Sequence, residues 1–172
     1  ICNSPEAGRA GAVALAYMDC LGRAGSDAEI RLWVENPAEI PALRDGICNS
    51  QEGRSRSIQS AYQTCLGRAA SQAEIDGWLA SGLSAAAAVS GICDSQEGKT
   101  RMITQSYQTC LGRVPSQAEI DGWLNAGIGA SDIKTGICES DEANRRRKII
   151  KSYSECLRRP ASADEIAELY QQ

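Results

Sequence analysis

The chain contains no histidine among its 172 residues. It therefore lacks the commonest general base and every Ser-His or Cys-His nucleophile pair, which argues against most hydrolase chemistry. No apolar run approaches the roughly 20 residues that cross a bilayer, and the longest run of small apolar residues covers only 85–89. The formal net charge of −4 gives no uniform positive field that would attract nucleic acid. We expect neither membrane insertion nor a nucleic-acid partner.

Carboxylates are the remaining candidates for acid–base chemistry. Glu74 and Asp76 recur as Glu119 and Asp121. A pair that returns with a repeat belongs to the architecture of the repeating unit rather than to one active site. We therefore expect no enzymatic activity, no catalytic residue, no metal site and no cofactor.

What the chain does contain is an internal repeat. Residues 60–79 return almost letter for letter at 106–124, and looser copies begin near residues 16 and 152. The tyrosines at 17, 62, 107 and 153 mark the period, with spacings of 45, 45 and 46 residues. Such a period is typical of stacked supersecondary units. We predict one repeat domain, 1–172, made of four modules at 1–46, 47–91, 92–136 and 137–172, of which the last is incomplete.

Each module carries helix signals and none carries strand signals. A serine followed by glutamate stands after each Ile-Cys pair and predicts the start of a first helix, with Ser4 as its N-cap in module one. Apolar positions then follow at i, i+4, i+7 and i+8, which is one buried stripe. Glycines at 22, 67 and 112 predict the helix end, and Arg158 at the fourth equivalent position predicts a looser or different closure.

Two further helices follow in each module. A Ser-x-x-Glu capping box begins a second, short helix in all four modules. A third segment, at 37–45, 84–90 and 130–135, predicts a brief helix that delivers the chain to a Gly-Ile-Cys triplet. The fold class is therefore all-α: four tandem helical repeats of about 45 residues, stapled by disulfides.

Eight cysteines alternate between two positions of the repeat. An even count at regular spacing indicates a disulfide framework and an oxidising compartment. Cysteines at the two ends of one first helix lie too far apart to bond. We therefore predict three bonds, each joining the end of a first helix to the start of the next and each closing 28 residues: Cys20 with Cys48, Cys65 with Cys93, and Cys110 with Cys138.

Cys2 and Cys156 remain after that pairing. They are the two halves of the same bond, at opposite ends of the chain. In a head-to-tail polymer, Cys156 of one molecule bonds Cys2 of the next. Otherwise the two close a ring within one chain, or the chain is a fragment whose neighbouring modules supplied their partners, or both thiols are free. The start at Ile1 fits either a mature secreted chain or an excised fragment.

The pattern Tyr-x-x-Cys-Leu-Gly-Arg, then Ser-x-x-Glu-Ile-x-x-Trp, then Ile-Cys-x-Ser-x-Glu resembles a bacterial repeat family known as domain of unknown function 4214. The matching positions, taken across module two and the start of module three, are Tyr62, Leu66, Gly67, Arg68, Ser71, Trp78 and Ser95. The resemblance covers all four modules and implies a small helical module of surface and secreted proteins, without catalytic residues. The chain departs from that pattern in its cysteines and at Arg158.

Two functional readings follow. The first is an extracellular structural protein, a disulfide-linked subunit of a filament, sheath or surface layer whose partners are copies of itself. The alternative is a monomeric secreted binding module, an adhesin segment in which Trp33, Trp78 and Trp123 form platforms for glycans. The same tryptophans also fit the packing of each second helix onto the first. Arg23, Arg68, Arg113 and Arg159 are expected to pair with neighbouring carboxylates or helix-end carbonyls rather than to bind anions.

Overall fold

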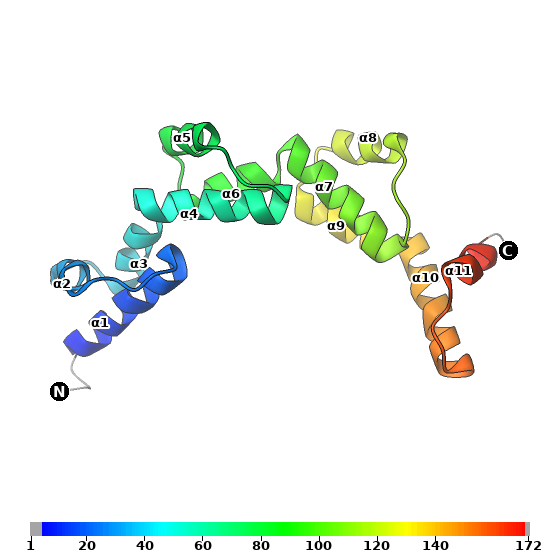
Figure 1. Ribbon diagram of the computed structural model, residues 1–172, viewed down its shortest axis with the longest axis horizontal. Helices are drawn as coiled ribbons and strands as arrows, with labels where there is room; N and C mark the ends of the chain where they lie inside the picture. Colours follow the sequence, from blue (N-terminus) through cyan, green and yellow to red (C-terminus); the bar gives the residue numbers. More distant parts are fainter. Residues whose placement is uncertain (1–4, 171–172) are drawn as a thin grey trace. The chain divides into compact units, whose positions relative to one another are not determined.

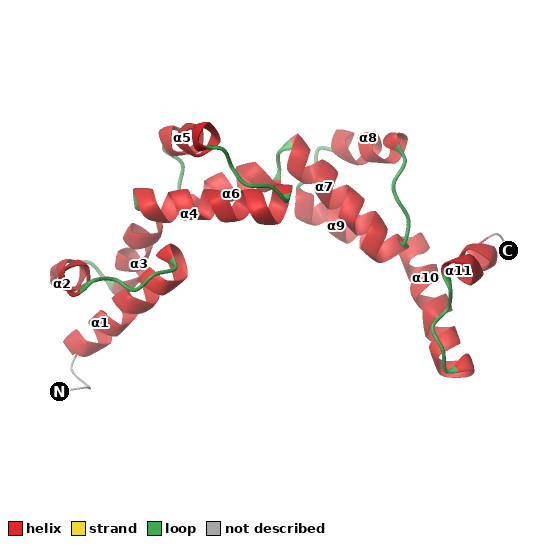
Figure 2. Ribbon diagram, viewed as in Figure 1, coloured by secondary structure: helices red, strands yellow, loops and turns green. Residues whose placement is uncertain are grey.

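The computed structural model describes residues 5–170, and within that range it contains helices and loops but no strand (Figures 1 and 2). Two compact units divide the chain after Ile92. The all-α class is confirmed. In the first unit the helices are α1 (Pro5–Ala16), α2 (Asp27–Glu35), α3 (Ile40–Cys48), α4 (Gln51–Ala61), α5 (Gln72–Ala80) and α6 (Ala85–Cys93). The π-helical turns η1 (Tyr17–Leu21) and η2 (Tyr62–Leu66) continue α1 and α4.

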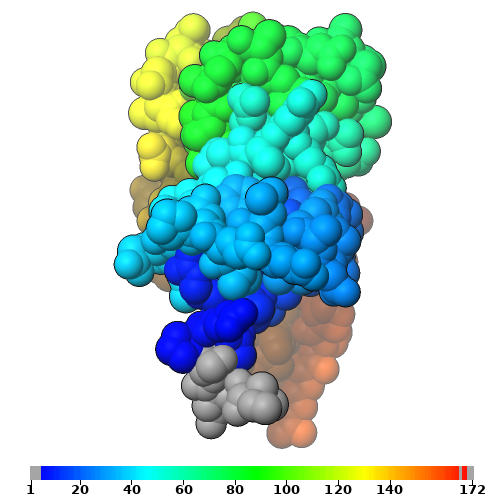
Figure 3. Space-filling model, turned by 90° about the vertical axis from the view of Figure 1, so that its left-hand side faces the viewer, coloured from blue at the N-terminus to red at the C-terminus, as the bar shows by residue number. Residues whose placement is uncertain are grey.

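The second unit repeats this order. Its helices are α7 (Gln96–Ser106), α8 (Gln117–Asn125), α9 (Ala130–Cys138), α10 (Asp141–Ser152) and α11 (Ala163–Tyr170). The turns η3 (Tyr107–Leu111) and η4 (Tyr153–Leu157) continue α7 and α10. Helix α9 lies against α7, as α3 lies against α1, so the third helix of a module covers the first (Figure 1). In Figure 3 the lighter blue residues of module one lie directly on the dark blue residues of α1.

Each first helix starts and stops as its sequence predicts. The hydroxyl groups of Ser50, Ser95 and Ser140 accept hydrogen bonds from backbone N–H groups in the first turn. Ser4 lies outside the described residues. At the other end Gly22, Gly67 and Gly112 are left-handed, with φ of 64°, 72° and 74°. The widened π turn just before the glycine was not predicted.

The predicted looser or different closure at Arg158 holds for the hydrogen bonding and not for the backbone conformation. The N–H of Gly22 donates to the Met18 carbonyl and that of Gly67 to the Gln63 carbonyl, and the Arg158 N–H makes no such bond within residues 5–170. Arg158 takes the same left-handed conformation as the glycines, with φ of 53°, and no other non-glycine residue in the described part of the chain has a positive φ. A side chain in this region is strained against its own carbonyl. Module four therefore keeps the turn without the residue that adopts it most easily.

The third helix ends later than the sequence predicted, at Cys48, Cys93 and Cys138 instead of 45, 90 and 135. It runs through the Gly-Ile-Cys triplet and ends on the cysteine, so that the isoleucine, for example Ile47 or Ile137, is buried at 1% exposure. This places Cys48 beside Cys20 with their Cα atoms 5.0 Å apart, and Cys138 beside Cys110 at 5.1 Å. Cys65 and Cys93 are bonded as well. The three predicted internal disulfides are present.

The apolar cores are separate. Module one is centred on Val13, Tyr17, Leu43 and Ile47, and module three on Ile103, Tyr107, Ile133 and Ile137. Ala143, at the start of α10, is the residue that the third core takes from the following module. Each of these cores is otherwise closed by the third helix of its own module.

Candidate functional site

Each tryptophan is held between a tyrosine and a glycine of its own module. The indole N–H of Trp33 donates to the Tyr17 hydroxyl at 3.2 Å, and Trp78–Tyr62 and Trp123–Tyr107 repeat this bond at the same distance. The ring edge faces the third helix, where a Cβ built on Gly46, Gly91 or Gly136 would lie 2.8 Å from the indole Cη2. The rings are half-buried. The tryptophans thus pack the second helix of each module onto its first and third helices. This packing accounts for the tryptophans without a ligand, and glycan binding stays a prediction.

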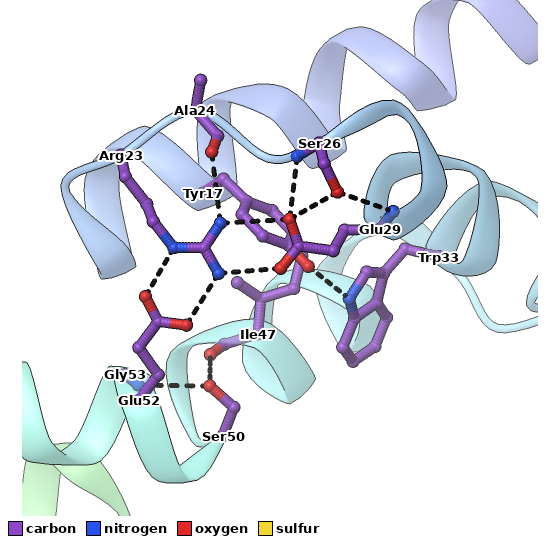
Figure 4. Close-up of polar contacts among 10 residues, drawn as sticks. All are labelled: Tyr17, Arg23, Ala24, Ser26, Glu29, Trp33, Ile47, Ser50, Glu52 and Gly53. Atoms are coloured by element: carbon purple, nitrogen blue, oxygen red, sulfur yellow. Dashed lines mark hydrogen bonds and ion pairs between the residues drawn. The ribbon is translucent and has the colours of Figure 1, made fainter.

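The loop arginine after each first helix lies over the same tyrosine. The guanidinium carbon of Arg23 is 5.3 Å from the centroid of the Tyr17 ring, and Arg113 is 4.8 Å from that of Tyr107. Arg23 also donates through Nη1 and Nη2 to both oxygens of Glu29, at 3.1 and 2.7 Å. Glu29 is the glutamate of the capping box, so the arginine ties the loop to the start of α2 (Figure 4).

The remaining edge of this arginine reaches the next module. Arg23 Nε and Nη2 donate to the two oxygens of Glu52, in the first turn of α4, at 2.6 and 2.8 Å (Figure 4). Arg113 repeats the arrangement with Glu142 of α10, at 2.7 and 3.0 Å. Paired N–H donors on a carboxylate fix orientation as well as distance. We call this arrangement, a loop arginine between the capping glutamate of its own module and the first-turn glutamate of the next, the module junction.

The junction holds its capping glutamates in the ionised form. Hydrogen bonds from Arg113, and then from the Ser116 backbone N–H, lower the pKa of Glu119 to about 2. The Arg23 guanidinium and Ser26 lower the pKa of Glu29 to about 2 in the same way. Arg23 also lowers the pKa of Glu52. These carboxylates are acceptors in a capping network at neutral pH and are not poised to exchange protons.

A second contact crosses these two junctions at the helix-ending glycine. A Cβ built on Gly112 would lie 2.7 Å from Nε of Arg146, which comes from α10 of the next module. A Cβ on Gly22 would likewise overlap the guanidinium of Arg56, from α4. The glycine therefore gives the left-handed turn and also leaves room for an incoming arginine. The third helix of the preceding module ends on a cysteine. The junction glutamate follows that cysteine by four residues, and the incoming arginine follows it by eight.

Within residues 5–170 no further module covers the outgoing half of a junction that module four presents. Cys156 is free and exposed, whereas Cys20, Cys65 and Cys110 at the same position are bonded. Leu157 is 55% exposed, against 7%, 9% and 6% for Leu21, Leu66 and Leu111. Arg159 donates to Glu165 through Nη1 and Nη2, and its Nε has no partner among residues 5–170. Cys2, the other candidate for an outward bond, lies outside the described residues.

The comparisons with known proteins add no assignment. A scan against protein-family models, a search of curated proteins and a search of solved structures each returned no match to the chain. The resemblance to the domain of unknown function 4214 therefore stays a prediction. Across residues 5–170 no helix has the length and apolar character to cross a membrane, and no three His, Cys, Asp or Glu side chains gather as metal ligands.

The sequence pattern missed several members of the site although their signals were present. The glycine of the Gly-Ile-Cys triplet recurs because the tryptophan ring lies against it. The glutamate four residues after the cysteine was assigned to favourable electrostatics at the helix start, yet it also accepts from the arginine of the preceding module. The arginine eight residues after the cysteine was not recognised as a recurring position. All three recur at fixed offsets, which was the available signal.

Proposed function

We propose that the protein is an extracellular structural subunit whose copies join head to tail through a disulfide between Cys156 and Cys2. The observation that carries the proposal is the state of Cys156: it is exposed and unbonded at a position where the three other modules form a disulfide. Three disulfides within the chain indicate an oxidising environment, in which an exposed thiol finds a partner.

The surface around Cys156 supports the same proposal. In modules one and three the tyrosine and leucine beside this cysteine are buried under the third helix. In module four Tyr153 is only half-buried, Leu157 is exposed, and Leu169 of α11 is 40% exposed. This apolar surface beside a free thiol favours covering by further protein over exposure to solvent, and the proposal assigns that cover to a second copy.

Gel electrophoresis of the native material, with thiols blocked before denaturation, tests the proposal. We expect a ladder under non-reducing conditions that collapses to one monomer band on reduction. Cys156→Ser should abolish the ladder, and so should Cys2→Ser, while the internal disulfides stay intact. A monomer that carries no blocked thiol would indicate a ring, and a monomer with two blocked thiols would indicate free ends. Either of these results would overturn the proposal.

A further inference from the structure

The two outward faces of the chain carry complementary halves of a module junction. One face belongs to module four, with Cys156, Arg158 and Arg159. The other belongs to α1, where Glu6 stands four residues and Ala10 eight residues after Cys2. Those are the offsets at which Glu52 and Arg56 follow Cys48, and Glu142 and Arg146 follow Cys138. Each position in an internal junction therefore has a counterpart on one of the two faces.

Two of the three counterpart pairs keep the residue types of the internal junctions. The cysteine pair is kept as Cys156 and Cys2. The ion pair is kept as Arg159 and Glu6: Arg159 has its Nε without a partner, and Glu6 is exposed and forms no ion pair within residues 5–170. In the internal junctions the corresponding Nε donates to the next module's glutamate at 2.6 and 2.7 Å.

The third pair is inverted. Inside the chain a glycine on the outgoing loop meets an arginine on the incoming helix, as Gly22 meets Arg56 and Gly112 meets Arg146. On the outward faces the outgoing loop carries Arg158 and the incoming helix carries Ala10. The arginine now lies on the outgoing loop and the small residue on the incoming helix, so the contact again pairs one arginine with one small residue. Arg158 keeps this place at the cost of a left-handed conformation that glycine adopts more easily.

We infer that a second copy of this chain docks on module four in the register of the internal junctions, with Arg159 on Glu6 and Arg158 over Ala10. This inference rests on the proposed function, and adds to it the non-covalent contacts that recognise the incoming copy before the disulfide forms. Continuity with two observed junctions and charge complementarity both favour a second copy over an unrelated partner. The inverted pair also disfavours mixed docking: Arg158 on an internal first helix would meet an arginine such as Arg56, and Ala10 on an internal loop would meet only a glycine such as Gly22.

Substitutions at the inverted pair test the register. Ala10→Arg places a second arginine opposite Arg158, and the steric conflict and like charge should weaken association at least about tenfold. Adding Arg158→Gly to Ala10→Arg recreates the internal arrangement, and association should return to within about threefold of the parent chain. Gly8→Arg is the matched control, because it adds the same charge to α1 at a site with no atom within 4 Å. It should leave association unchanged.

Association is measured in two ways on the full chain. Sedimentation equilibrium of the Cys156→Ser background gives the non-covalent dissociation constant, and the rate of ladder formation in a glutathione buffer reports alignment of the two thiols. If the parent chain forms the ladder but Ala10→Arg behaves like Gly8→Arg, or if Arg158→Gly does not rescue it, the register is wrong while the proposed function stands. A parent chain without a ladder overturns the proposed function, and the inference with it.

Discussion

The packing of tryptophan against a helical glycine gives the sharpest test of how each module holds together. In module three, Gly136 lies inside α9, and a Cβ at that position would be 2.8 Å from Cη2 and 3.1 Å from Cζ3 of Trp123. Real Cβ atoms are essentially never found closer than 3.0 Å to such a neighbour. We therefore predict that Gly136→Ala destabilises the protein, although alanine is the better helix former.

The magnitude follows from two opposing terms. Alanine in a helix interior is favoured over glycine by about 0.5–1 kcal/mol. Inserting a methyl group into a filled contact costs about 1–3 kcal/mol. Gly122 is the matched control, because it lies inside α8 with no atom within 4 Å of its Cβ position. Gly122→Ala should stabilise by up to about 1 kcal/mol, and since helix propensity cancels between the two variants, their difference should be about 1–3 kcal/mol.

Urea unfolding followed by circular dichroism, with the disulfides intact, measures both variants on one scale. A third variant closes the argument: in a Trp123→Leu background, which reproduces the residue type of Leu169 in module four, Gly136→Ala should stabilise as Gly122→Ala does. If Gly136→Ala and Gly122→Ala raise stability equally in the parent chain, the tryptophan is not packed against the glycine and this account of the module is refuted.

Three further predictions follow from the junctions and the rings. The capping glutamates have a pKa near 2 in the folded protein and near 4.5 when free, so their contribution to the free energy of unfolding is complete above about pH 4.5 and is lost as the pH falls toward 2. Glu119→Gln should therefore lower Tm at pH 7 and make Tm fall less steeply between pH 4.5 and pH 2. A dependence of Tm on pH that does not change in this variant would contradict the assignment. Arg158→Gly should raise the stability of module four by about 0.5–1 kcal/mol in thermal unfolding, because it relieves a left-handed arginine, and a lower Tm would argue against strain there. The tryptophan emission should resist acrylamide quenching and stay unmoved by added glycans; quenching equal to that of a free indole, or a glycan-induced shift, would instead favour the platform interpretation.

Much of the fold was predictable because each decision was local and recurred. A helix start depends on a serine and a glutamate a few residues apart, and the end of a first helix depends on a glycine. The start of α5 at Ser71 and Glu74 and the end of η2 at Gly67 could therefore be predicted from the sequence. The disulfides followed from geometry, because a straight helix separates Cys48 from Cys65. The predicted end of the third helix was too early, since a glycine near the end of a helix resembles a stop until the tryptophan packed against it is seen.

The junction was less predictable because it joins residues from two modules. Arg23 was expected to pair with a carboxylate, but the choice of both Glu29 and Glu52 depends on where α4 begins relative to the preceding loop. The role of Arg56 depends on empty space over Gly22, which is a property of the backbone and not of either residue type. To predict such contacts, one must know how the helices of two modules lie relative to each other. In a single sequence the only sign of this arrangement is that the residues recur at equal offsets in successive repeats.

The position of the disulfides has a mechanical consequence. Because Cys20 is bonded to Cys48 and Cys110 to Cys138, a pull along the oxidised chain passes from one cysteine to its partner and bypasses the second and third helices. The load is carried only by the first helices, such as the 17-residue span from Cys48 to Cys65. Stretching that span from helical to fully extended lengthens it from about 25 Å to about 60 Å. Under tension each such first helix would extend by a short, fixed length, while the second and third helices enclosed by the disulfide stayed folded.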